Sequence, residues 1–307
     1  MSDLLSVILP TFLLIAIGYA AAHFRFMDQK AGEGISDYVF FIATPALVLR
    51  SMIHAQFPDV PPWGYWSAYF IGVAIVWATA MVLATRVQGQ SHATSVIAGF
   101  AAGQSNTVLV GIPVILKAYG DAGAAPLFLL IAVHLPINLT VASFLFEGRK
   151  GLHGKQIAQN MILHPMMIAL FIGLAIRHMG INPPGPVTSV MNFLADTTIP
   201  CALVAMGLAL HHYGIQTKLS EIGPILVLKL LIHPAIVYAL AFHVFDMPKV
   251  WAGVAVLFAA MPSGINAFLF AARYRTGEAL ASSAIALSTG LAFASTLFWL
   301  WMLGIGG

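Results

Sequence analysis

Long apolar runs alternate with short polar segments along the whole chain. Clusters of charged residues, Pro and Gly divide the sequence into ten such runs, at residues 4–24, 32–53, 64–85, 94–118, 122–146, 157–179, 187–210, 221–244, 249–272 and 277–303. A helix needs about 20 apolar residues to cross a bilayer. Strands of a membrane β-barrel would instead show short segments of alternating polarity. The pattern therefore predicts an all-α integral membrane protein with ten transmembrane helices.

The composition agrees with this prediction. Of the 307 residues, 60% are hydrophobic and 8% are charged, whereas a soluble domain is about one quarter charged. So few polar residues cannot cover a soluble fold of this size, which leaves the lipid bilayer as the surrounding medium. The single cysteine, Cys201, excludes an internal disulfide. No basic cluster interleaved with aromatic residues indicates a nucleic-acid partner.

Lys and Arg in the predicted loops indicate the orientation of the chain. Loops after odd-numbered spans hold nine of these residues, loops after even-numbered spans hold four, and Lys229 lies within a span. Because cytoplasmic loops carry the excess of positive charge, we expect the odd loops in the cytoplasm and both termini outside the inner (plasma) membrane. The first run is preceded by Asp3 rather than by Lys or Arg, so we expect a retained span and not a signal peptide.

Three residue pairs recur in the sequence at one fixed offset of 155 positions: Pro10 with Pro165, Gly18 with Gly173, and Pro45 with Pro200. This offset carries the first span onto the sixth and the second onto the seventh. It divides the chain into two five-helix repeats, at residues 1–150 and 151–307. Because five is odd, the second repeat enters the membrane from the opposite side. Inverted repeats of this kind can expose one site alternately to each side, which favours a secondary transporter.

The fourth and ninth predicted spans are interrupted near their middles by polar residues, Gly and Pro. The fourth contains Asn106 and Pro113, and the ninth contains Pro262, Ser263 and Asn266. Broken helices in a bilayer must face protein or a watery cavity, and the positive ends of half-helices favour an anion. The two Asn residues add hydrogen-bonding groups without a buried charge. The alternative is that Pro only kinks each helix and Asn only bonds to a neighbouring helix.

Two charged residues lie within predicted spans. Lys229, in the eighth span, is a candidate partner of an anionic substrate, although it could also snorkel or bond to a carbonyl group. Asp196, one turn before Pro200, is the best candidate for a proton or cation coupling site. No HExxH motif and no acidic cluster able to hold two metal ions occurs, so we expect neither an enzyme nor a metal site.

Several motifs make the chain recognisable. The most specific are Met261-Pro262-Ser263-Gly264-Ile265-Asn266-Ala267-Phe268, Ala272-Arg273-Tyr274 and Leu287-Ser288-Thr289, together with Asn106-Thr107, Gly111 and Pro113, Pro45-Ala46-Leu47, and Leu228-Lys229 with Pro234. With them, nearly the whole chain resembles the auxin efflux carrier family, which includes the plant PIN carriers and bacterial members often labelled malonate transporters.

The resemblance implies a fold like that of the bile-acid sodium symporters, in which broken helices four and nine cross. It implies a scaffold from helices 1, 2, 6 and 7, an elevator-like transport domain from helices 3–5 and 8–10, and a homodimer through the scaffold. The site residues that it carries over are Asn106, Pro113, Pro262 and Asn266. The chain departs from the plant carriers in lacking a long loop between the fifth and sixth spans, so regulation through such a loop is not expected.

We therefore expect a carrier of a small carboxylate, auxin-like or malonate-like, with the substrate at the crossing of helices 4 and 9. Ser263 and Lys229 are counted with the four carried-over residues as candidate substrate contacts. No cofactor is expected, while coupling to sodium ions or protons stays open. The alternatives are a channel and a sodium- or proton-coupled symporter of a different solute.

Overall fold

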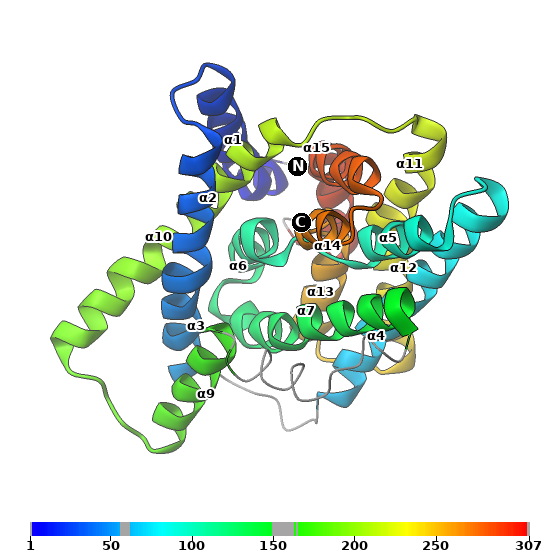
Figure 1. Ribbon diagram of the computed structural model, residues 1–307. Coiled ribbons are helices and arrows are strands. Elements are labelled where there is room, and N and C mark those ends of the chain that lie inside the picture. Colours follow the sequence, from blue (N-terminus) through cyan, green and yellow to red (C-terminus); the bar gives the residue numbers. More distant parts are fainter. Residues whose placement is uncertain (1, 56–61, 149–162, 164, 306–307) are drawn as a thin grey trace.

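The computed structural model describes residues 2–55, 62–148, 163 and 165–305, and the side chains from residue 8 onward within that part. Across this part of the chain the protein is helical apart from one isolated β-bridge. The predicted loop at 147–156 and the first part of the predicted span at 157–179 fall mostly outside the described residues. Figure 1 shows the helices in two groups, which lie side by side.

The α1/α10 group lies at the left of Figure 1. It consists of α1 (Ser2–His23), α2 (Gln29–Tyr38), η1 (Val39–Ala43), α3 (Thr44–Ile53), α9 (Pro165–His178) and α10 (Gly185–His212). Helix α1 packs on α10, and α9 packs on α3. These elements correspond to the predicted first, second, sixth and seventh spans.

The α5/α13 group holds the remaining helices. In chain order these are α4 (Trp63–Val82), η2 (Leu83–Val87), α5 (His92–Gly103), η3 (Thr107–Gly111), α6 (Ile112–Tyr119), η4 (Gly120–Gly123), α7 (Ala124–Glu147), α11 (Leu219–Val227), η6 (Leu228–Ile232), α12 (His233–Ala239), η7 (Leu240–Val244), α13 (Lys249–Ala260), α14 (Asn266–Arg273) and α15 (Glu278–Met302). Several of the η elements are single π turns that continue a neighbouring α-helix without a break.

Six helical runs in the described part are long and apolar enough to cross a membrane: Gln29–Ile53, Trp63–Val87, Thr107–Glu147, Gly185–His212, Leu219–Val244 and Glu278–Met302. Three shorter apolar helices accompany them, at Ile8–His23, Pro165–His178 and Lys249–Ala260. The number of long apolar helices, and the absence of strands from the described residues, confirm the predicted all-α integral membrane class.

Glycines allow two close helix crossings in the α1/α10 group. A Cβ atom added at Gly18 of α1 would collide with the carbonyl oxygen of Val204 in α10, and one at Gly207 would collide with the carbonyl oxygen of Ile15. A Cβ atom at Gly173 of α9 would lie 2.6 Å from Cβ of Met52 in α3. Gly18 and Gly173, which recur at the repeat offset, therefore occupy equivalent positions in two crossings, α1 on α10 and α9 on α3.

Proline-induced gaps in the helical hydrogen bonding are filled by neighbouring helices. Pro234 has no N–H to donate to the carbonyl of Leu230, one turn earlier. That carbonyl instead accepts from Ser295 Oγ at 2.8 Å and from Trp299 Nε1 at 2.9 Å, both on α15. The π turn η6 and α15 are thereby held together inside the bundle.

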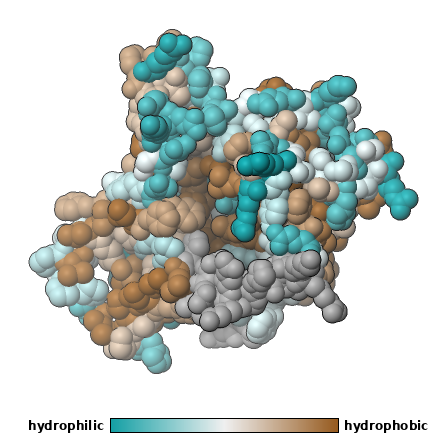
Figure 2. Space-filling model, in the orientation of Figure 1, coloured by the Kyte–Doolittle hydropathy of each residue, from teal (hydrophilic) through white to brown (hydrophobic). Residues whose placement is uncertain are grey.

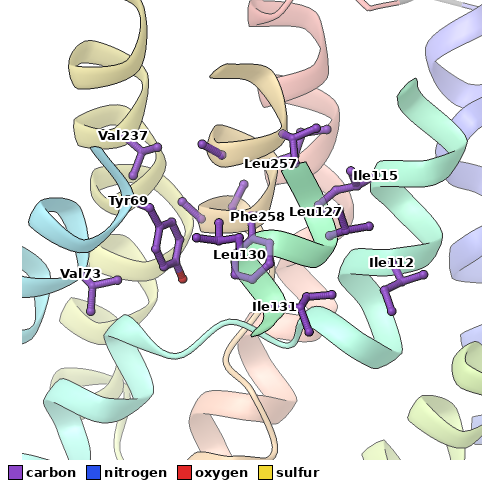
Figure 3. Close-up of a cluster of buried hydrophobic side chains, with 14 of the residues drawn as sticks. Tyr69, Val73, Ile112, Ile115, Leu127, Leu130, Ile131, Val237, Leu257 and Phe258 are labelled. Carbon is purple, nitrogen blue, oxygen red and sulfur yellow. The ribbon is translucent and has the colours of Figure 1, made fainter. Parts of the chain in front are cut away.

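Aromatic and aliphatic side chains fill the centre of the α5/α13 group. Figure 3 shows Tyr69 of α4 beside Phe258 of α13, with ring centroids 5.1 Å apart at an interplanar angle of 85°. Both side chains are buried, as are Leu127 and Leu130 of α7. This packing surrounds the polar groups described below with apolar atoms.

The outer surface carries large apolar side chains that a soluble protein would cover. Figure 2 shows hydrophobic residues over the arm formed by α9 and α10. Exposed members include Phe171 and Ile172 of α9 and Val190 and Phe193 of α10. A lipid environment, or a further apolar partner, accounts for such a surface.

Candidate functional site

The first break separates α5 from η3. Helix α5 ends at Gly103, and Gln104 then adopts an extended conformation with φ −86° and ψ 119°. Helical structure resumes at Thr107, with Asn106 in the capping position before it. Pro113 is buried in the first turn of α6, so it follows the break rather than causing it. The π turn η3 runs directly into α6, so Pro113 lies within the second half of the broken helix.

The second break separates α13 from α14. Helix α13 ends at Ala260, and Met261 is extended with φ −63° and ψ 148°. Pro262 follows and has no N–H, while α14 begins at Asn266. Asn106 and Asn266 therefore occupy similar positions, each at the N-terminal start of the second half of a broken helix.

The two breaks pair with each other as a short antiparallel bridge between Ser105 and Ser263. The N–H of Asn106 donates to the carbonyl of Pro262 at 2.8 Å, and the N–H of Gly264 donates to the carbonyl of Gln104 at 2.9 Å. These hydrogen bonds satisfy backbone groups that the breaks remove from the helices, as an apolar interior requires. They are also related by a local two-fold symmetry in which Asn106 corresponds to Gly264, two residues before Asn266.

Ser263 is fully buried and its polar groups are bonded within the protein. Its hydroxyl donates to the carbonyl of Ala101 in α5 at 2.8 Å, and its N–H donates to Ser288 Oγ of α15 at 2.9 Å. Ser263, predicted as a substrate contact, thus links three helices around the bridge.

The two asparagines differ in their surroundings. Asn106 is 5% exposed, and its Nδ2 donates to the sulfur of Met206 in α10 at 3.1 Å. Sulfur is a weak acceptor, so a stronger acceptor would compete well for this amide. Asn266 is half-buried, and its side chain makes no hydrogen bond to any described residue. Both amides therefore keep hydrogen-bonding capacity for a ligand.

Lys229, in the π turn η6, is fully buried directly against the bridge. Its ammonium donates to Ser105 Oγ at 2.7 Å and to the carbonyl of Ala259 at 2.7 Å, and lies 3.4 Å from Nδ1 of His233. No carboxylate among the described residues contacts it. The structure thus brings Lys229 together with both breaks, on the C-terminal end of α13, where the helix dipole favours a positive charge.

Three buried polar side chains next to the bridge were not among the predicted site residues. Their shared feature is contact with Gln104 or Ser105, and they are Tyr69, His134 and Asn138. His134 Nε2 accepts from the N–H of Ser105 at 3.3 Å, so a neutral ring carries its proton on Nδ1, which lies 3.0 Å from Tyr69 Oη. His134 and Asn138 lie four residues apart in an apolar span, so the sequence could have indicated a polar face there. Nothing in the sequence singles out Tyr69.

Asp196 does not lie with these residues. It is on α10, its side chain is 67% exposed, and its Oδ1 lies 2.6 Å from Nη1 of Arg50 on α3. No group of three or more His, Cys, Asp or Glu side chains that could hold a metal ion occurs in the described part of the chain.

Comparison of the sequence with those of known proteins identifies its family. Residues 3–300 match the family model described as "Membrane transport protein". The "Putative malonate transporter" of Rhizobium meliloti (strain 1021) is 25% identical, with 100% of this chain and 98% of the relative covered. An "Uncharacterized transporter" of Methanothermobacter thermautotrophicus is 22% identical, over 95% of this chain and 96% of the relative.

A plant relative extends the likeness beyond microbes. "Auxin efflux carrier component 8" of Arabidopsis thaliana is 21% identical, with 98% of this chain and 97% of the relative covered. The match to a membrane transport family, together with the several apolar helices described above, makes this a multi-pass membrane protein. The chain therefore belongs to the membrane transport protein family, the family of the auxin efflux carriers.

Proposed function

We propose that this protein is a secondary carrier that moves a small carboxylate across the membrane by alternating access. One observation carries the proposal: two broken helices meet at a bridge, so that η3 and α14 both begin there. The N-terminal end of a helix offers free N–H groups and a partial positive charge, which suit a carboxylate. Asn106 and Asn266 add amide groups at these two ends without adding charge.

The names of the relatives support the substrate class. One relative is named for malonate and another for auxin. Both compounds are carboxylates, and the two helix ends would meet the carboxylate group that they share. Pro113 and Pro262, both buried next to the breaks, would shape the site rather than bond to the ligand.

We propose that the α1/α10 group is the scaffold and that the α5/α13 group carries the substrate in an elevator-like movement. Ten spans in two inverted repeats fit this division. The equivalent crossings of α1 on α10 and α9 on α3, and the two-fold hydrogen bonds of the bridge, support such a repeat. Inverted repeats provide two related conformations, open to opposite sides.

We also propose that Lys229 supplies the positive charge that a bound sodium ion would supply in a coupled symporter. Its ammonium is held by a helix-terminal carbonyl and a hydroxyl, which are ligand types that bind a cation. Asp196, which was considered as a coupling site, is paired with Arg50 away from the bridge. Transport would then need no sodium ion.

We further propose a membrane location and an oligomeric state for the protein. The distribution of Lys and Arg supports an inner (plasma) membrane protein with both termini outside. The exposed apolar side chains of α9 and α10 support a homodimer formed through the α1/α10 group. Cross-linking in native membranes would test the dimer.

The carrier is tested by counterflow in proteoliposomes. Vesicles preloaded with unlabelled malonate or indole-3-acetate should accumulate the labelled compound transiently, because a carrier exchanges substrate across the membrane. Asn266→Ala should abolish this exchange. An ohmic current with no counterflow would instead indicate a channel, and uptake that requires a sodium or proton gradient would indicate a coupled symporter.

A further inference from the structure

A cavity of about 1080 Å³ lies between the two helix groups, away from the bridge. One wall comes from α3 and α10 of the α1/α10 group, and the other comes from η4, the start of α7 and the start of α13. Its charged lining residues are Arg50, Asp121, Asp196 and Lys249.

The cavity is separate from the proposed substrate site. Lys249 is the first residue of α13, and the bridge follows the last residue of this 12-residue helix. A helix of that length spans about 18 Å. The segments of chain that line the cavity follow even-numbered predicted spans or lie at the start of odd-numbered ones, so they share one side of the membrane.

Arg50 is the residue best suited to bind a ligand in this cavity. Among the described residues its one ion-pair partner is Asp196, with Nη1 at 2.6 Å from Oδ1, and its side chain is 31% exposed. A guanidinium has five N–H donors in a planar fork that matches a carboxylate. The remaining donors have no protein acceptor among the described residues.

The partner of Arg50 is easily replaced. Asp196 is 67% exposed, and exposed ion pairs contribute little to stability. A carboxylate ligand would take the place of the Asp196 carboxylate on the guanidinium of Arg50, so Arg50 would stay paired with one negative charge. Lys249, from the facing wall, offers a second positive charge to a ligand with two anionic groups.

We propose that this cavity is a second binding site for small carboxylates, in which the ligand displaces Asp196 from Arg50. The biological role of this second site rests on the proposed carboxylate carrier. In such a carrier, the site would hold the substrate on one side of the membrane before or after the substrate binds at the bridge. The binding itself is independent of transport and is tested alone.

The test replaces the single natural cysteine and introduces a reporter thiol. In a Cys201→Ser background, Ser51→Cys places a reactive thiol in the cavity lining, and Asn182→Cys places one in an exposed segment on the same side, outside the lining. The rate of labelling by a membrane-impermeant maleimide is measured in right-side-out vesicles with increasing malonate, and with chloride at matched ionic strength.

Malonate should slow labelling of the Ser51→Cys variant and leave labelling of the Asn182→Cys variant unchanged. Because a charge-assisted pair is lost, adding Arg50→Gln should raise the half-protecting malonate concentration about tenfold. Because a competitor for Arg50 is removed, adding Asp196→Asn should lower that concentration about threefold. These opposite signs separate a ligand site from a structural ion pair, which would give both substitutions the same sign.

Three results would overturn the inference: protection by chloride equal to that by malonate, protection unchanged in Arg50→Gln, or weakened protection in Asp196→Asn. Protection should persist in Asn106→Ala, in which the proposed transport is lost. Loss of protection in that variant would mean that malonate acts only through the bridge and that the cavity holds no site.

Discussion

Lys229 Nζ lies 2.7 Å from the carbonyl oxygen of Ala259, so a buried ammonium covers the C-terminal end of α13. The same ammonium reaches Ser105 Oγ in the other break at 2.7 Å. One side chain from a third helix therefore joins both broken helices. A positive charge is favourable at this end of a helix, whereas η3 and α14 begin, with their N-terminal ends, after the bridge residues along the chain.

We expect transport to be independent of sodium, because the ammonium of Lys229 already occupies the carbonyl-rich end of the break. Replacing external sodium by choline in the proteoliposome assay should leave the initial rate of malonate uptake unchanged. A sodium-dependent rate would show that a cation site exists elsewhere and that the role proposed for Lys229 is wrong.

Lys229→Met should abolish transport and destabilise the protein. The substitution keeps an unbranched apolar stem but removes the ammonium that donates to Ser105 Oγ and leaves the carbonyl of Ala259 without its donor. A buried group left unsatisfied costs about 1–3 kcal/mol, so the melting temperature in detergent should fall. Lys117→Met, near the end of α6, is the matched control and should retain both properties. Normal uptake by Lys229→Met would contradict the proposed role.

Asn266→Ala should abolish carboxylate binding at the bridge, but not in the cavity, while the protein stays folded, since this side chain has no described hydrogen-bond partner to lose. Asn106→Ala should do the same, with a small loss from the contact to Met206. Thermal shift with malonate, in an Arg50→Gln background that weakens binding in the cavity, measures both effects, and the loss should correspond to at least about 1.4 kcal/mol, or tenfold in affinity at the bridge. Asn182→Ala, in an exposed segment, is the control. Unchanged malonate shifts in both variants would remove the proposed site from the bridge.

Ser263→Ala should lower stability more than it lowers substrate affinity. Its hydroxyl donates its proton to the carbonyl of Ala101, which would lose a buried hydrogen bond worth about 1 kcal/mol. The melting temperature and the malonate affinity of the folded fraction separate the two effects. A large loss of affinity with unchanged stability would make Ser263 a direct substrate contact, as the sequence predicted.

Gly207→Ala should prevent α1 and α10 from packing, because a Cβ atom there would collide with the backbone of α1 at Ile15. Backbone cannot move aside as a flexible side chain can, so we expect little folded protein in size-exclusion chromatography. Gly290→Ala, in α15 with nothing within 4 Å, is the control. It should be neutral or stabilising by about 0.5–1 kcal/mol, because Ala favours a helix over Gly. Equal yields of both variants would contradict the close crossing.

Much of the architecture was readable from local pattern. The all-α membrane class follows from the lengths of apolar runs, because lipid forces each crossing segment to satisfy its own backbone. The breaks near Asn106 and Pro262 were likewise visible, because Gly, Pro and small polar residues are conspicuous in an apolar run. These features depend on composition and spacing over about 20 residues.

Contacts between distant segments were decided only by the tertiary structure. The sequence places Asn106 and Asn266 in the two interrupted spans, but only the bridge shows that Asn106 is related to Gly264, since register depends on which N–H meets which carbonyl. Lys229 could have snorkelled, met a substrate or bonded to a carbonyl group, and only the fold shows that it is buried with its ammonium on the carbonyl of Ala259. Asp196 was the best candidate for a coupling site from the sequence, and only the fold shows that Arg50, 146 residues away, pairs with it. An isolated polar residue has many possible partners, and only the packing of whole helices selects one.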